Sequence, residues 1–342
     1  MKEGILTVEY DSFKKREKLD ETCEKYEKRE NEDAYIVDED AGVFVIADGC
    51  TRHHGKYASQ EASTFVANEL RRLAEHPPSD GQGHPFRHYM RDALELANQK
   101  LIMYGTRNKL EPLPATTLDA VVLRENNTLY FAHVGDSSIY TVKNGKAEKL
   151  TKDQSVMAEK REKNGLDEDQ AKALYADSSS PTNFLGMLNF QRKDIEAESM
   201  PGAQRIVMVT DGLTNVCTSQ ELKDLLVNYS GRKLIEKAFQ IYTRPHQIFE
   251  VYLRENRQSI VDLITAQTDA KFIEIQKALI PLGALEEKFA KIDDYMNHST
   301  NFKKMVYNSF MEKHGQGDDF TIIVIELGAG LKFRIKKTFG IR

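Results

Sequence analysis

Cysteine is scarce in this chain, whose 342 residues include only Cys23, Cys50 and Cys217. Three scattered cysteines build neither a disulfide framework nor a zinc site. Long apolar runs are also missing. The N-terminal segment lacks the apolar core of a signal peptide, and no stretch approaches the roughly 20 residues that a membrane-spanning helix needs. The sequence therefore predicts a cytoplasmic protein without a transmembrane segment.

An excess of charge of either sign is missing as well. Lysine and arginine number 48, aspartate and glutamate 53, and the formal net charge is −5. A dedicated nucleic-acid-binding protein needs a strongly basic face to neutralise phosphates, so we expect no nucleic-acid partner. With 40% hydrophobic and 30% charged residues, the composition is typical of a globular protein, and the length fits one large domain with insertions.

Short β-rich runs alternate with helical patterns in the first half of the chain. Apolar residues recur at helical spacing over residues 57–74 and 88–104, and residues 157–175 form a more polar predicted helix. Between residues 118 and 150 the β-rich runs are separated by turn signals, among them the pair Asn144–Gly145. Consecutive hairpins imply antiparallel sheets and argue against a doubly wound parallel fold.

Two segments depart from this pattern. Residues 219–313 have helical patterns with little strand character and predict a helical insertion, and residues 328–342 form a basic C-terminal tail. A packed helical bundle and a disordered tail are the simplest interpretations. The alternatives are a docking surface on the insertion for a substrate or regulator, and contact of the tail with an acidic membrane surface or a partner.

Acidic residues stand at the ends of apolar β-runs. The five positions are Glu32–Asp33, Asp48–Gly49, Gly135–Asp136, Asp211–Gly212 and Asp318–Asp319. One Asp-Gly pair after a strand is ordinary turn chemistry. Five such positions can gather at one rim of a sandwich, where like charges repel unless a cation neutralises them. Oxygen ligands without cysteine or histidine partners indicate Mg²⁺ or Mn²⁺.

These acidic positions belong to an ordered series of motifs. The series consists of ENEDA, VFVIADG, GKYAS, ATTLDAVVL, AHVGDSSIY, LTKDQS, PTNFLG, VMVTDGLTN and GDDFTIIVI. Over about residues 29–327 it resembles the metal-dependent serine/threonine protein phosphatases of the type-2C class. The resemblance implies an α+β fold, a four-layer αββα sandwich of two antiparallel sheets flanked by helices, in a phosphatase domain of residues 1–327. Residues 156–182 match the family's flap, a mobile segment beside the metal site that helps to choose substrates.

The resemblance also implies two or three Mn²⁺ or Mg²⁺ ions at one rim of the sandwich. Asp48 would bridge two ions, Glu32 and Asp33 would act mainly through metal-bound waters, and Asp136 would help to hold a third ion. Asp319 stands where the family usually has asparagine, and we leave it outside the ligand set. The implied ligands are the Gly49 carbonyl and the carboxylates of Glu32, Asp33, Asp48, Asp136, Asp211 and Asp318.

The implied reaction is hydrolysis of phosphoserine and phosphothreonine in proteins, by a monomeric enzyme and without a phosphoenzyme. Two divalent ions about 4 Å apart lower the pKa of a shared water and offset the charge of the phosphate oxygens. The alternatives are a pseudo-phosphatase that only binds, a phosphatase of a small non-protein phosphomonoester, and an unrelated β-rich binding protein. The presence of Asp48, Asp136, Asp211 and Asp318 favours the enzyme over the pseudo-phosphatase.

The residues expected to contact the phosphate depart from the family pattern. Lys28 stands where the family has a phosphate-binding arginine, and Arg29 follows it. Either could bind phosphate, although lysine offers a point charge in place of a bidentate fork. Cys50 replaces the histidine that serves many members as general acid, and its thiol is better suited to packing. His53 and His54 follow on the same loop and could donate that proton, or could be incidental.

Overall fold

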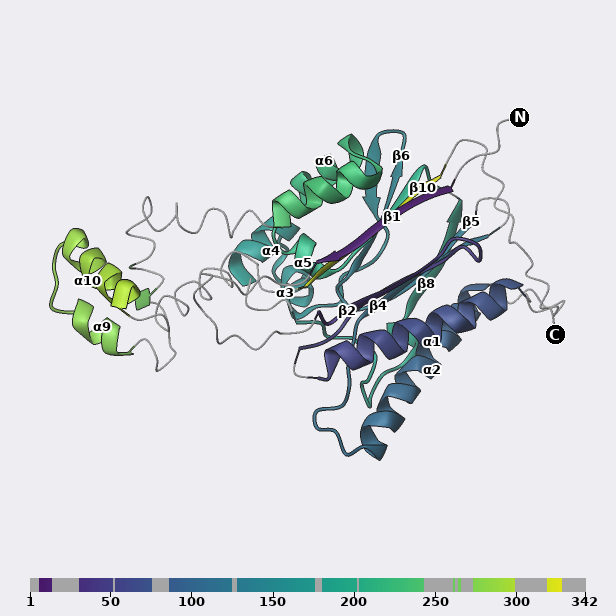
Figure 1. Ribbon diagram of the computed structural model, residues 1–342, viewed down its shortest axis with the longest axis horizontal. Helices are drawn as coiled ribbons and strands as arrows, with labels where there is room; N and C mark the ends of the chain where they lie inside the picture. The colour runs from purple at the N-terminus through teal and green to yellow at the C-terminus, as the bar shows by residue number, and fades with distance from the viewer. Residues whose placement is uncertain are drawn as a thin grey trace.

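The protein is a sandwich of two antiparallel sheets with helices on both outer faces (Figure 1). The computed structural model describes residues 6–13, 31–51, 53–75, 86–124, 128–175, 180–201, 203–242, 261, 264–265, 273–298 and 319–327. This architecture confirms the predicted α+β four-layer fold. Within the described residues, no helix is long and apolar enough to cross a membrane.

The first sheet has five strands in the order β2-β3-β4-β5-β8, and every neighbouring pair is antiparallel. Its outer face is covered by α1 (Gly55–Glu75) and α2 (Phe86–Arg107), which correspond to the two helices expected from apolar spacing. The strands are β2 (Asp33–Asp38), β3 (Val43–Asp48), β4 (Leu118–Arg124), β5 (Thr128–Val134) and β8 (Glu196–Pro201).

The second sheet has the order β1-β10-β9-β6-β7 and is also antiparallel throughout. Its outer face carries the one-turn helix α5 (Asp211–Thr214), α6 (Ser219–Asn228) and a helical segment over 231–242. The strands are β1 (Leu6–Phe13), β6 (Ser138–Lys143), β7 (Lys146–Lys149), β9 (Arg205–Val209) and β10 (Phe320–Leu327).

Alternation along β3 explains why the sandwich has two separate apolar layers. Val43 and Val45 pack toward the helices, whereas Phe44 and Ile46 pack between the sheets. Successive side chains of a strand point to opposite faces, so a fully apolar run buries both. The same alternation turns Asp48, the last residue of β3, toward the space between the sheets.

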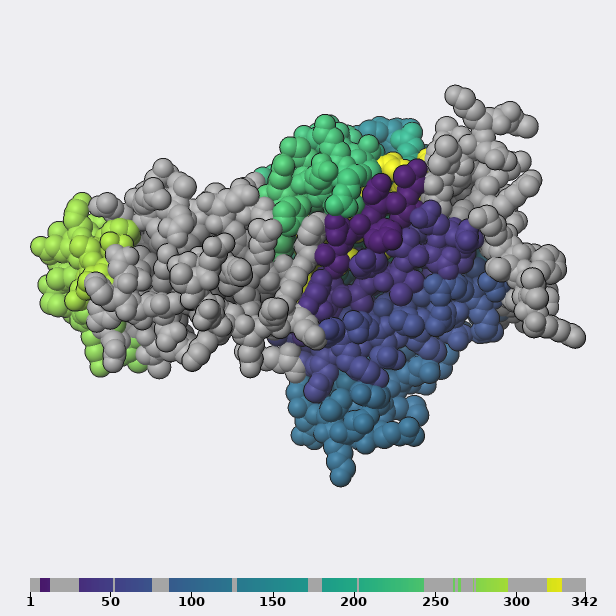
Figure 2. All heavy atoms as spheres, in the orientation of Figure 1, coloured from purple at the N-terminus to yellow at the C-terminus, as the bar shows by residue number. Residues whose placement is uncertain are grey.

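Two edge strands, β1 and β8, were not expected from the sequence. Residues of β1 such as Tyr10 are exposed, and this strand lies on the molecular surface between α6 and α1 (Figure 2). An edge strand is paired on one side only and can carry polar residues, which removes the apolar run that identifies a central strand. The sequences LTVEYDSF and EAESMP show this mixture.

The predicted helix over residues 157–175 is two helices, α3 (Val156–Asn164) and α4 (Glu168–Tyr175). Ser155 caps the start of α3, because its hydroxyl accepts a hydrogen bond from the Ala158 amide. Gly165 ends α3 with a left-handed φ of 64°, a conformation that favours glycine. The polar pattern of the sequence did not reveal this break.

The described part of the 219–313 segment is helical, as expected. Beyond α6 and residues 231–242 it contains α9 (Ile273–Leu279) and α10 (Leu285–His298). Figure 1 shows α9 and α10 beside the sandwich rather than in one of its layers. The predicted basic tail, residues 328–342, lies outside the described residues.

Candidate active site

Four aspartates lie buried at one rim of the sandwich, where strands of both sheets end. We call Asp33, Asp48, Asp136 and Asp211 the carboxylate rim; each is exposed by 8% or less. Asp33 is the direct cross-strand partner of Asp48. The other two follow β5 and β9, so both sheets contribute to one acidic cluster.

Hydroxyl groups join the two sheets beneath the rim. The Thr210 hydroxyl accepts a hydrogen bond from the Thr321 amide at 2.9 Å and donates one to Asp33 Oδ2 at 2.9 Å. A second hydrogen bond, 3.2 Å long, connects the hydroxyls of Thr117 and Ser137. Threonine and serine at these strand ends therefore fix how the carboxylates of one sheet face those of the other.

The backbone at Asp48 is held on both sides. Its carbonyl accepts hydrogen bonds from the Thr117 amide at 2.8 Å and the Thr116 hydroxyl at 2.7 Å. The Gly49 amide donates to the Glu32 carbonyl at 3.1 Å. A Cβ on Gly49 would lie 2.3 Å from the backbone of Gly55, the first residue of α1. Only glycine allows the strand end and the helix start to approach so closely.

Asp211 begins α5 and is oriented by its own helix. The Asn215 side-chain amide donates to Asp211 Oδ2 at 2.8 Å. The next residue, Gly212, packs on the backbone before β10, since a Cβ there would lie 2.0 Å from the Asp319 carbonyl oxygen. The Asp-Gly pair predicted here as a turn or a ligand is thus a tight junction between β9, α5 and β10.

Glu32 is positioned by groups around the rim. Its amide donates to Asp319 Oδ2 at 2.7 Å, and its side chain accepts from the Thr51 hydroxyl at 2.8 Å. Asp319, which we left outside the predicted ligand set, is itself buried. Its carboxylate thus holds the Glu32 peptide.

A cavity of about 250 Å³ opens beside the rim. His53 forms part of its wall, and the His53 and Phe184 rings lie 6.3 Å apart. His54 is exposed, with a φ of 51°, at the start of α1. The structure thus separates the two adjacent histidines. The cavity is lined by Asp48, Gly49, Cys50, Thr51, His53, Thr117, Asp136, Ser180, Pro181, Phe184 and Asp211.

Burial dominates the electrostatics of the rim. Burial, with the charges of Asp319 and Asp211 added, raises the pKa of Asp33 to about 8, and hydrogen bonds from Thr321 and Thr210 offset only part of the rise. Burial also raises the pKa of Asp211, against hydrogen bonds with Asp48 and Asn215. Without a cation, carboxylates this close resist ionisation together.

Comparison with known proteins identifies the family. The family model for protein phosphatase 2C matches residues 24–249, about two thirds of the chain. The chain belongs to the protein phosphatase 2C family. The expected resemblance is therefore confirmed, and the enzyme is a protein phosphatase.

Individual relatives of this phosphatase are distant. The protein phosphatase PhpP of Streptococcus pneumoniae is 26% identical over 198 residues, which are 54% of this chain and 73% of the relative. The serine/threonine phosphatase Stp1 of Staphylococcus aureus superposes with a TM-score of 0.55 at 17% identity, covering 95% of this chain and 97% of its own. The catalytic domain of the phosphatase PstP in complex with two manganese ions gives 0.51 at 14% identity, covering 95% and 99%. These structures share the fold.

The donor groups of this 2C-family phosphatase fit divalent cations. Asp33 Oδ1 and Asp211 Oδ1 are buried and have no hydrogen-bond partner, which leaves two carboxylate oxygens available to an ion. Hard oxygen donors suit Mg²⁺ or Mn²⁺. Among the described residues, no three acidic, histidine or cysteine side chains are arranged so that together they could hold a metal ion. The predicted ligand Asp318, and Lys28 and Arg29, lie outside the described residues.

Asp153 is a further acidic residue at the phosphatase site that sequence reasoning missed. Its Oδ1 atom is buried without a hydrogen-bond partner, and its charge contributes to the raised pKa of Asp211. The residue belongs to the motif LTKDQS, which contributed to the family resemblance but was not assigned a role. Its position after β7, rather than at the end of an apolar run, gave no local signal.

Proposed function

We propose that the chain hydrolyses phosphoserine and phosphothreonine in proteins with the help of Mn²⁺ or Mg²⁺ held at the carboxylate rim. The observation that carries this proposal is the gathering of four buried aspartates beside a cavity, with unpartnered oxygens on Asp33 and Asp211. Burying like charges is unfavourable unless cations neutralise them. The bound manganese reported for the related PstP domain supports the same class of ion.

Each ligand has a proposed task. Asp48, Asp211, Asp318 and the Gly49 carbonyl would hold the core ions. Glu32 and Asp33 would act mainly through water, and Asp136 would help to hold a third ion. When bound, such ions supply an acidified water and positive charge for the phosphate oxygens. The count of two or three ions, and the preference between Mn²⁺ and Mg²⁺, belong to the proposal.

His53 is the better candidate of the two histidines for proton donation to the leaving group. Its Nδ1 lies 3.3 Å from the Leu113 carbonyl oxygen, which can only accept, so this nitrogen carries a hydrogen. Nε2 is then the nitrogen that would donate a proton to the leaving group. His53 lines the cavity, whereas His54 is exposed. Lys28 and Arg29 are proposed to bind the phosphate.

The cavity favours a phosphorylated side chain over a bare phosphate. Pro181 and Phe184 add apolar surface to the wall of the cavity, and the Phe184 ring lies 6.3 Å from that of His53. Pro181 lies within the segment that we propose as the flap, residues 156–182, and Phe184 follows it; both belong to the proposed phosphatase domain of residues 1–327. A regulator docking on the insertion, residues 219–313, and a separate tail, residues 328–342, complete the proposed organisation.

The test is the substitution Asp48→Asn, assayed by phosphate release from a phosphothreonine peptide with Mn²⁺ present. We expect hydrolysis to be abolished and the fold retained, because removing one of several repelling carboxylates does not destabilise the metal-free protein. Asp40→Asn is the matched control, since Asp40 is exposed in the turn at the opposite end of the same β2–β3 hairpin. Near-normal activity of Asp48→Asn would overturn the metal assignment.

A further inference from the structure

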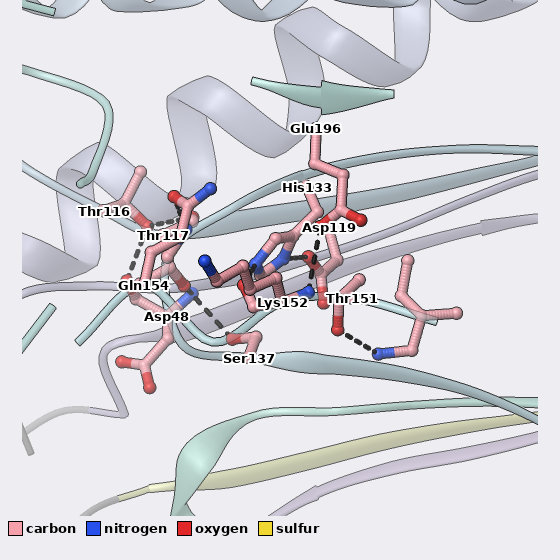
Figure 3. A network of polar contacts seen from close by, with 12 residues as sticks. Asp48, Thr116, Thr117, Asp119, His133, Ser137, Thr151, Lys152, Gln154 and Glu196 are labelled. Atoms are coloured by element: carbon pink, nitrogen blue, oxygen red, sulfur yellow. Dashed lines mark hydrogen bonds and ion pairs between the residues drawn. The ribbon is translucent and has the colours of Figure 1, made fainter. Parts of the chain in front are cut away.

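A buried acid–histidine pair lies between the sheets behind the carboxylate rim (Figure 3). Asp119 on β4 and His133 on β5 are direct cross-strand partners, and neither side chain has any exposed surface. The His133 Nδ1 and Asp119 Oδ1 atoms are 2.5 Å apart. Their neighbours along the two strands, such as Val121 and Phe131, belong to the apolar layer between the sheets.

Strand register places this pair directly behind the rim. Asp119 is paired with Ile46 on β3, two residues before Asp48. Residues two apart on a strand point to the same face and are about 6.6 Å apart along it. The pair therefore occupies the row behind Asp33 and Asp48, on the same face of the same sheet.

The second nitrogen of His133 holds the chain after β7. Its Nε2 lies 2.9 Å from the Lys152 carbonyl oxygen, and because a carbonyl only accepts, Nε2 carries a hydrogen. On the other side, the Lys152 amide donates to Glu196 Oε2 at 2.9 Å. The backbone at Lys152 is thus fixed by one hydrogen bond at its carbonyl and another at its amide, and Figure 3 shows Lys152 near both His133 and Glu196.

The residues after Lys152 in turn hold the loop that bears Asp136. The Gln154 amide donates to the Gly135 carbonyl at 2.9 Å, and the Gly135 amide donates to Gln154 Oε1 at 3.0 Å. Gly135 has a φ of 117°, and a Cβ there would lie 2.6 Å from the Thr117 side chain. Asp136 follows directly, and Asp153 stands between the two fixed residues, so both carboxylates depend on this segment.

Stability alone does not explain a polar pair at this position. Replacing a buried ion pair by apolar residues of similar volume is often neutral or stabilising. Burial alone would lower the pKa of His133, but Asp119 and the nearby Glu196 outweigh it and raise the pKa, so the pair keeps its shared proton. What an apolar pair could not provide is the donor that holds the Lys152 carbonyl.

We propose that Asp119 and His133 are positioning residues that fix the Lys152–Gln154 segment and, through it, orient Asp136 at the cavity wall and Asp153 near Asp211. This inference rests on the proposed function of the rim. It predicts that disrupting the pair loosens the loop that carries Asp136 and the segment that carries Asp153. The other proposed ligands stay in place. Second-layer partners of metal ligands typically change affinity or activity 10–100-fold when removed.

The central test is the double substitution Asp119→Leu/His133→Leu in the full chain, which fills the core and leaves no unpaired charge. We expect the Gly135 and Gln154 amides to exchange hydrogen about tenfold faster or more, while the Ala120 and Ala132 amides of the β4–β5 ladder stay protected. With Mn²⁺, we expect turnover of a phosphothreonine peptide to fall about tenfold or more at unchanged KM.

The single substitutions His133→Gln and His133→Asn supply the matched comparison. Glutamine can reach with its amide as far as Nε2 and rescue the contact with Lys152, whereas asparagine reaches only as far as Nδ1 and keeps the contact with Asp119. We expect His133→Gln to keep most of the protection against exchange and most of the turnover that the double variant loses. We expect His133→Asn to keep neither.

Unchanged exchange at Gly135 and Gln154 in the double variant would overturn the proposal, whatever the activity. Equal behaviour of the glutamine and asparagine variants would also contradict it. Failure of the proposed function would be seen instead in the wild-type protein, as an absence of hydrolysis, and would leave the exchange measurements interpretable.

Discussion

The substitution Gly49→Ala tests how tightly the rim is built. A Cβ at residue 49 would lie 2.3 Å from the carbonyl carbon and oxygen of Gly55 and 2.7 Å from the Glu32 carbonyl oxygen. Ordinary contacts begin at 3.4 Å, so the start of α1 would have to move by roughly 1 Å. These neighbours are backbone atoms and cannot rotate away.

We expect Gly49→Ala to lower the free energy of unfolding by about 3 kcal/mol, the upper end of the range for overpacking. For a domain of this size, that corresponds to a fall in Tm of about 6–12 °C. The displacement separates Asp48 from Glu32, so we also expect weaker Mn²⁺ binding. Urea denaturation and calorimetric titration with Mn²⁺ measure the two effects.

Gly283→Ala is the matched control, because a Cβ at Gly283 meets no atom within 4 Å. We expect this variant to have the stability and metal affinity of the parent protein. Neutral surface changes alter stability by no more than about 0.5 kcal/mol. Close packing at the rim would be refuted if Gly49→Ala stayed within this range of the parent and bound Mn²⁺ with equal affinity.

Three further predictions concern ions and protons at the rim. Asp136→Ala should lower turnover about tenfold or more while leaving occupancy of the core ions unchanged, as measured by calorimetry and peptide assay together; unchanged turnover would remove Asp136 from the mechanism. In the metal-free protein, Asp33 keeps a proton up to about pH 8, whereas the unfolded chain releases it near 3.8. The folded state thus binds more protons than the unfolded state across this window, so the stability of the metal-free protein should fall as pH rises from about 4 to 8. Urea titrations that found a rise in stability would contradict this expectation. Chelation should lower the Tm of the metal-loaded protein, because an ion present at 100 times its Kd stabilises the folded state by about 2.7 kcal/mol. A Tm that does not change with chelator would count against a bound ion.

The carboxylate rim was accessible to sequence reasoning because its signal is local. Asp48 and Asp211 each follow an apolar strand and precede a glycine, a pattern visible within a few residues. The structure adds the contacts that bring these aspartates together. Cross-strand register sets Asp33 opposite Asp48, and Thr210 of the other sheet hydrogen-bonds to Asp33.

Features that depend on distant pairing could not be predicted in the same way. Strand β1 pairs with β10, so that Leu6 lies opposite Leu327 at the other end of the chain. The Asp119–His133 pair depends on the register of β4 and β5, and one residue of slippage would turn one partner away. Asp153 is positioned near the rim by hydrogen bonds of its neighbours Lys152 and Gln154 to residues that are distant in the sequence. No local sequence pattern predicts these bonds.

We propose that hydrolysis by this 2C-family phosphatase depends on divalent ions at the carboxylate rim, and a metal titration tests this proposal. Metal-stripped protein is mixed with a phosphothreonine peptide, and phosphate release is followed as Mn²⁺ or Mg²⁺ is added. We expect no phosphate release without metal, release that saturates as the ions bind, and loss of release when a chelator is added. Release that persists in excess chelator, or a protein that neither binds the ions nor hydrolyses the peptide, would contradict it.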